Sequence, residues 1–126
     1  MISDSLRPEL AWAVAAAQNK KADAVTVLDL TGIGAFTDYF LICSGESARQ
    51  IQAITDEIEE QLGRRGVAPM HREGGETAEW VLLDYGDFVI HVFSQRARLF
   101  YDLERLWRAA RRFDFAENAP AGAAEP

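Results

Sequence analysis

The stretch WVLLDYGDFVIHVF, residues 80–93, decides the fold because it holds two strand patterns around a tight turn. Trp80–Tyr85 and Phe88–Phe93 are apolar runs rich in aromatic and β-branched residues, which are favoured in strands. Gly86 and Asp87 separate the two runs, and both residue types are favoured in turns. The stretch therefore predicts an antiparallel hairpin.

The first strand of this hairpin is apolar on both of its faces. Successive side chains of a strand alternate, so Trp80 and Leu82 point one way and Val81, Leu83 and Tyr85 the other. Such a strand is either a central strand covered by helices or a strand whose aromatic residues meet a partner. The pattern alone leaves both interpretations open.

Downstream of the hairpin, the spacing of apolar residues predicts a last helix from about Ser94. Its apolar side would consist of Leu99, Leu103, Leu106, Trp107 and Ala110. Its final turns would carry Arg108, Arg111 and Arg112, since cations are favourable at the negative end of a helix. From residue 117 the chain is mostly Ala, Gly, Pro and Glu, which cannot bury enough apolar surface to fold. We predict one domain over residues 1–115 and a disordered tail over residues 116–126.

Upstream, Ser47–Gln50 has the pattern of a capping box, in which serine and glutamine side chains satisfy backbone donors at a helix start. The helix that follows has an apolar stripe made of Ile51, Ile54, Ile58 and Leu62. Gly63 or Gly66 would end it. Val67–Arg72 contains a proline and is predicted to be an edge strand or an extended connector.

The first 44 residues add one helix and two strands. A helix is predicted from about Ser5 to Asn19, with Pro8 in its first turn. Ala24–Leu30 and Tyr39–Ser44 are strand-like, the second being apolar enough for the centre of a sheet. The order α-β-β-α-(β)-β-β-α predicts an α/β (α+β) sandwich, in which helices pack on a mixed sheet of about five strands.

Composition narrows the classes of function. The chain has 126 residues, a formal net charge of −7 and one cysteine. An acidic chain is poorly suited to bind bare nucleic acid directly, because phosphate contacts need clustered lysines and arginines, and we expect no direct contact with DNA. A single cysteine cannot form an internal disulfide, which favours a cytoplasmic location. No apolar run approaches the roughly 18 residues of a membrane span, so we expect no membrane contact.

Residues that could carry chemistry are few. His91 lies within an apolar strand, where a hydrogen-bonded imidazole is the common finding, and Cys43 fits a small core residue. Neither has the clustered ligands that zinc requires. Asp84 and Asp87 could hold magnesium, which makes a nucleotidyltransferase-like enzyme the main alternative. They lie three residues apart across a turn, however, and the sequence has no glycine-rich phosphate-binding motif. We expect no enzyme activity, no metal and no cofactor.

Several segments together resemble the ribosomal silencing factor (Iojap-like) family, with matching order and spacing from about Ala22 to Trp107. The segments that carry the resemblance are Asp38-Tyr39-Phe40-Leu41-Ile42, the helix start Ser47–Gln50, Glu73-Gly74, the run 80–93 and Tyr101-Asp102-Leu103-Glu104-Arg105-Leu106-Trp107. The run of fourteen residues followed by the Tyr-x-Leu-Glu-x-Leu-Trp helix is highly specific.

The resemblance implies a small α/β fold with a topology related to nucleotidyltransferases but without an evident active site. It implies a homodimer when free, and binding to ribosomal protein L-fourteen on the large ribosomal subunit. A bound factor would block joining of the small subunit and repress translation when nutrients are short. Relatives are also implicated in maturation of the large subunit.

The family's contact surface corresponds here to Trp80 and Tyr85, with Leu82 and Asp84 beside them. The acidic turn before the hairpin corresponds to Glu73 and Gly74. Relatives also have leucine at the position of Tyr85, so the resemblance does not require an aromatic ring there. Aromatic anchors beside carboxylates would complement a basic ribosomal protein.

Overall fold

The computed structural model describes residues 7–116. In chain order, its elements are α2 (Pro8–Asn19), β1 (Asp23–Asp29), β2 (Tyr39–Gly45), α3 (Ala48–Gly63), β3 (His71–Glu73), β4 (Trp80–Asp84), β5 (Phe88–Ser94), α4 (Gln95–Tyr101), α5 (Leu103–Leu106) and β6 (Arg111–Phe115). No helix within this range is long and apolar enough to cross a membrane.

The strands form one mixed sheet in the order β3-β4-β5-β2-β1-β6. β2 and β5 are parallel, and every other neighbouring pair is antiparallel. The predicted hairpin is confirmed as β4 and β5, with Trp80 opposite Phe93 and Leu82 opposite His91. The apolar strand around Leu41 lies at the centre of the sheet, as predicted. The α+β class with a mixed sheet is therefore confirmed.

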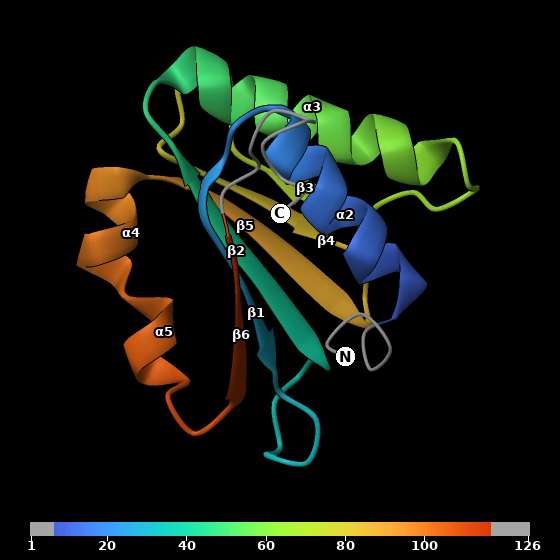
Figure 1. Ribbon diagram of the computed structural model, residues 1–126, viewed down its shortest axis with the longest axis vertical. Coiled ribbons are helices and arrows are strands. Elements are labelled where there is room, and N and C mark those ends of the chain that lie inside the picture. The colour runs from blue at the N-terminus through green and yellow to red at the C-terminus, as the bar shows by residue number, and fades with distance from the viewer. Residues whose placement is uncertain (1–6, 117–126) are drawn as a thin grey trace, which may run out of the picture.

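Helices pack on both faces of the sheet (Figure 1). α2 and α3 lie together over one face, where the larger core cluster includes Ile54, Val81 and Ile90. α4 and α5 lie on the opposite face, over a smaller cluster that includes Phe40, Phe93 and Ala97. The two clusters bury side chains on both faces of β2 and β5, which explains why these central strands are apolar throughout.

The start of α3 forms largely as predicted. The Ser47 hydroxyl accepts a hydrogen bond of 3.1 Å from the backbone N–H of Gln50. The Gln50 side chain accepts in return from the N–H of Glu46, one residue earlier than a capping box requires. All four residues of the predicted stripe are buried: Ile51, Ile54, Ile58 and Leu62. The helix ends at the predicted Gly63.

The prediction of one continuous helix after Ser94 is wrong beyond Tyr101. Asp102 has φ of +50°, a left-handed conformation that interrupts the helix between α4 and α5. Two residues of the predicted apolar side face away from the sheet: Leu99, within α4, is 81% exposed, and Leu106, after the break, is 70% exposed. Leu103 and the neighbouring Trp107 do pack against the smaller core cluster.

The segment predicted to end that helix is instead the sixth strand. β6 pairs antiparallel with β1, with Phe113 opposite Val27 and Phe115 opposite Val25. From Arg112 its side chains alternate between exposed and partly buried, the period of an edge strand with one face on the core. The arginines assigned to the last helical turns, Arg111 and Arg112, belong to this strand.

Two predicted boundaries fall at the limits of the described residues. α2 begins at Pro8, and the earlier start near Ser5 lies outside them. Residues 117–126, most of the predicted tail, also lie outside. The carbonyl of Ala116 is described and accepts a hydrogen bond of 2.8 Å from the Gln18 side chain. The division into a domain over residues 1–115 and a tail stays a prediction.

Candidate functional site

β4 places the predicted contact residues by its alternation. Val81 and Leu83 are fully buried in the larger core cluster beneath α2 and α3. Trp80 and Leu82 point to the other face, where both are partly buried against the smaller cluster. Asp84 lies two residues after Leu82, so its side chain is on the same face of the strand, and it is also partly exposed. One face of β4 is therefore core, and the other is accessible beside α4.

An aromatic group surrounds the Trp80 ring, and we call Trp80, His91, Phe93 and Tyr101 the Trp80 cluster. The ring centroid of Trp80 lies 4.5 Å from that of Tyr101 and 4.9 Å from that of Phe93. The indole Nε1–H donates a hydrogen bond of 3.1 Å to Nδ1 of His91. Ring contacts on several sides together with a directed hydrogen bond fix the orientation of the indole.

His91 acts here as a neutral hydrogen-bond acceptor. Its side chain is only 3% exposed, and burial lowers its pKa from 6.5 to about 3. Because Nδ1 accepts from Trp80, the imidazole proton is on Nε2, which has no hydrogen-bond partner within residues 7–116. The histidine therefore serves to hold Trp80 and is unsuited to act as a base at neutral pH.

We expect the free energy of unfolding to fall by about 2 kcal/mol between pH 7 and pH 5 on account of His91. In the unfolded chain the imidazole has its ordinary pKa of 6.5 and takes up a proton in this range, whereas the buried imidazole does not. The stabilisation is thus complete above about pH 6.5 and is lost as the pH falls. Urea denaturation at several pH values in this range should show the free energy of unfolding falling with pH for wild type. The dependence on pH should be weaker for His91→Gln. The exposed His71→Gln is the control and should retain the slope, and a profile unchanged in His91→Gln would contradict the assignment.

The predicted acidic turn lies directly beside β4. Glu73 is the register partner of Leu82 on the edge strand β3, and its carboxylate pairs with His71. Gly74 follows with φ of +105°, and a Cβ there would lie 2.7 Å from the Trp80 carbonyl oxygen. A side chain at position 74 would therefore push the turn away from Trp80. The structure brings together five of the six predicted residues: Trp80, Leu82, Asp84, Glu73 and Gly74.

Tyr85 is the predicted residue that the structure does not bring to this surface. Its ring stacks on Phe88 with centroids 4.8 Å apart and packs against the larger core cluster, on the opposite face from Trp80. Burial raises the pKa of its hydroxyl, which has no hydrogen-bond partner within the described range. Tyr85 therefore serves chiefly to close the hairpin over the core.

The carboxylates of the turn have structural partners. The Asp84 Oδ1 accepts a hydrogen bond of 2.8 Å from the backbone N–H of Gly86. Asp87 forms an ion pair of 2.8 Å with Arg7. Across residues 7–116, no group of three or more histidine, cysteine, aspartate or glutamate side chains is arranged to hold a metal ion. Both carboxylates thus stabilise the turn and its contact with the start of α2.

Cys43 and His91 do not form a nucleophile–base pair. Cys43 belongs to the larger core cluster, whereas His91 contacts Phe40 and Phe93 on the opposite face of the sheet. Burial raises the pKa of the Cys43 thiol to about 12, so the reactive thiolate is scarce at neutral pH.

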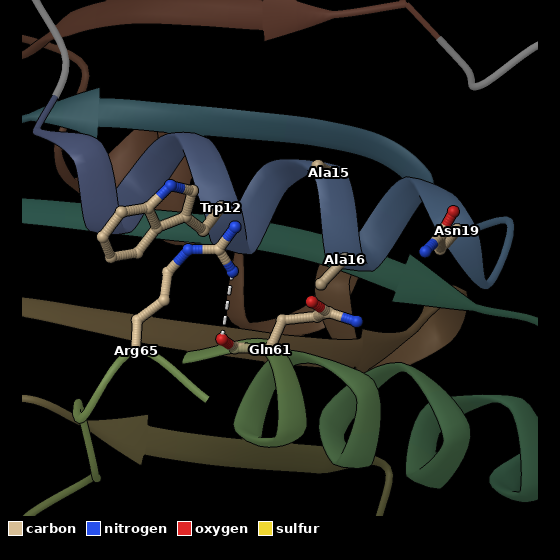
Figure 2. A pocket seen from close by; sticks show the side chains of 6 residues that line it. All are labelled: Trp12, Ala15, Ala16, Asn19, Gln61 and Arg65. Atoms are coloured by element: carbon tan, nitrogen blue, oxygen red, sulfur yellow. Dashed lines mark hydrogen bonds between the residues drawn. The ribbon is translucent and has the colours of Figure 1, made fainter. Parts of the chain in front are cut away.

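A surface hollow of about 160 Å³ lies between α2 and α3, away from the predicted site (Figure 2). The guanidinium of Arg65 lies 4.5 Å from the ring centroid of Trp12 and donates a hydrogen bond to the Gln61 carbonyl. The remaining lining residues are Ala15, Ala16 and Asn19. With no carboxylate, imidazole or thiol in its lining, this hollow has no group for acid–base or nucleophilic chemistry.

Three members of the Trp80 cluster were not predicted as functional residues from the sequence: His91, Phe93 and Tyr101. His91 was interpreted as an ordinary core histidine, yet the strand register that places it beside Trp80 follows from the hairpin turn. Tyr101 lies in a segment that carries the family resemblance, but its contact with Trp80 depends on how α4 packs on the sheet. The position of His91 beside Trp80 could have been predicted from the register of the hairpin. The position of Tyr101 could be found only from the tertiary structure.

The fold and this surface define a small α+β protein with a mixed sheet and a partly exposed aromatic cluster at one side. The chain belongs to the ribosomal silencing factor family, because the model of that family, described as "Ribosomal silencing factor during starvation", matches residues 3–126.

Relatives and solved structures agree with this assignment. A Bacillus subtilis protein named ribosomal silencing factor RsfS is 46% identical over 95 residues, covering 75% of this chain and 80% of that protein. A crystal structure from Chromobacterium violaceum has a TM-score of 0.75 at 32% identity and covers 79% of this chain and 82% of that chain. A crystal structure from Bacillus halodurans has a TM-score of 0.70 at 45% identity. The match covers 78% of this chain and 91% of that chain.

Proposed function

We propose that this protein represses translation by binding ribosomal protein L-fourteen on the large subunit and blocking the small subunit from joining. The observation that carries the proposal is the Trp80 ring, partly exposed and held in place by His91 and Tyr101. A large ring fixed before binding loses little conformational entropy on contact, which is typical of binding hot spots. Family membership supports a ribosomal partner.

Charge near Trp80 supports a basic partner. The Glu73 side chain is 65% exposed, and Asp84 on the same face of the strand pair is partly exposed. Carboxylates at the rim of an aromatic contact favour lysines and arginines on the opposing surface and disfavour acidic partners. A basic ribosomal protein matches this pattern.

We propose further that the protein is not an enzyme, that it is a homodimer when free, and that it acts in the cytoplasm. The Bacillus subtilis relative reported above is a silencing factor by name, and the carboxylates of the turn already have structural partners. The homodimer and the location rest on the family resemblance and the single cysteine. Light scattering of the purified protein measures the oligomeric state.

Sedimentation with purified ribosomal subunits tests the function. The protein should sediment with large subunits and not with small subunits, and adding it before the small subunit should reduce the fraction of joined ribosomes. Nucleotide with magnesium should leave the melting temperature unchanged, since a ligand of the native state would raise it. Absence of sedimentation with large subunits would overturn the proposal, as would binding that leaves subunit joining unaffected.

A further inference from the structure

The α4–α5 segment is basic within an acidic chain. Residues 95–112 contain six arginines and two carboxylates, whereas the whole chain has a formal net charge of −7. Four of these arginines have carboxylate partners: Arg96, Arg98, Arg111 and Arg112. Arg105 and Arg108 are exposed, and neither pairs with a carboxylate within residues 7–116. Two uncompensated guanidinium groups thus face solvent on this side of the protein.

These arginines line a groove together with exposed apolar side chains. The groove has a volume of about 490 Å³ and runs along α4 and α5. Its lining includes Phe100 and Leu106, which are 79% and 70% exposed. Phe100 meets Tyr101 edge to face at 5.0 Å between centroids, so most of the Phe100 ring surface is open. Large exposed apolar side chains gathered in one patch are uncommon on a surface without a partner.

We propose that this α4–α5 groove binds an unpaired segment of the large subunit's RNA. Arg105 and Arg108 pair with phosphates, and a base packs on the Phe100 ring. Guanidinium groups match the geometry of phosphate oxygens, and open aromatic rings are the usual stacking platforms for unpaired bases. The inference rests on the proposed function, because it requires the protein to be bound at the large subunit.

Charge complementarity favours RNA over a second copy of this chain. In a two-fold symmetric dimer built on the groove, the same patch would meet itself, bringing Arg105 and Arg108 against their own copies. Like charges facing each other oppose such a contact. An acidic peptide would neutralise the arginines but has no flat base to cover Phe100.

The groove is continuous with the proposed protein contact. Tyr101 lines the groove and also lies 4.5 Å from Trp80 between ring centroids. Because the groove adjoins Trp80, a large subunit whose ribosomal protein bound there would present its neighbouring RNA to the groove. One side of the molecule would then contact both components of the subunit.

The salt dependence of binding to purified large subunits tests the phosphate contacts. Replacing both groove arginines, Arg105→Gln with Arg108→Gln, should reduce the slope of log K against log salt by about 1.4, since each phosphate contact of a single strand contributes about 0.7. The control, Arg49→Gln with Arg64→Gln, removes one exposed cation from the first turn of α3 and one that directly follows this helix, on the other side of the sheet, and should leave the slope unchanged.

A photo-crosslinking amino acid at position 100 identifies what the groove contacts. Irradiation of its complex with large subunits should give a ribonuclease-sensitive crosslink that maps to one segment of the subunit RNA. A crosslink to a ribosomal protein or to a second copy of this chain overturns the proposed RNA contact. Provided that wild type binds the subunit, the absence of any crosslink also overturns it, and so does a salt slope that the two arginine substitutions leave unchanged. Failure of wild type to sediment with large subunits overturns both this inference and the proposed function.

Discussion

Glu104→Ala is expected to lower the free energy of unfolding by about 3–5 kcal/mol, because it leaves the buried Arg98 without its counter-ion. Nη2 of Arg98 lies 2.7 Å from Oε2 of Glu104, and the two side chains are only 10% and 15% exposed. Removing one member of a buried ion pair leaves a largely desolvated charge without a counter-ion.

Arg98 joins four elements, which increases the expected cost. From α4 it reaches Glu104 in α5, Thr26 in β1 and Ser44 in β2. The bonds to the two hydroxyls are 3.3 and 3.4 Å long, so they cannot replace a carboxylate at 2.7 Å. Losing this pair should therefore loosen α4 and α5 together.

Urea denaturation at pH 7 measures the effect. The matched control is Glu60→Ala, which breaks the pair of Glu60 and Arg64, whose side chains are 56% and 66% exposed. An exposed pair of this kind contributes about 0–1 kcal/mol, so the control should remain close to wild type. Replacing both buried partners, Arg98→Met with Glu104→Leu, should restore much of the loss. A loss in Glu104→Ala no larger than in Glu60→Ala would contradict the role of the pair.

Arg98 also explains why the end of the chain could not be predicted from the sequence. Apolar spacing after Ser94 favours one long helix, and Arg98 is not among the residues predicted for its apolar side. In the structure the Arg98–Glu104 pair joins α4 to α5 across Asp102, whose left-handed backbone breaks the helix. The free edge of β1 then takes β6 as its partner. The spacing of apolar residues along the sequence reveals neither an ion pair between residues six positions apart nor a free edge of β1 that another strand can join.

The candidate site was more predictable because it depends on strand alternation. The pleat of β4 separates Trp80 and Leu82 from Val81 and Leu83, and this division follows from the sequence alone. The same alternation places Tyr85 on the core side, although the resemblance had grouped it with Trp80. The position of Tyr101 against Trp80 required the packing of α4, which has no signature in sequence spacing.

Trp80→Ala is expected to weaken binding to the large subunit by at least about 2 kcal/mol, or roughly 30-fold, the scale of a binding hot spot. The substitution removes the ring that Tyr101, Phe93 and His91 hold at the surface. Trp80 is partly buried, so the substitution should also lower stability, though by less than the roughly 3–5 kcal/mol expected for a fully buried tryptophan. Binding must therefore be measured where the variant is fully folded.

The control for this experiment is Trp12→Ala, because Trp12 is also partly buried but lies on α2, on the other face of the sheet. It should lose stability and keep wild-type binding to purified large subunits. Tyr85→Ala should resemble the control, since its ring packs on the core beside Phe88. Trp80→Phe keeps a ring but has no N–H for His91, so it should bind with intermediate affinity. If Trp80→Ala is folded and binds like Trp12→Ala, the contact surface lies elsewhere on the protein. If Tyr85→Ala loses binding while staying folded, the contact extends to the opposite face of the sheet.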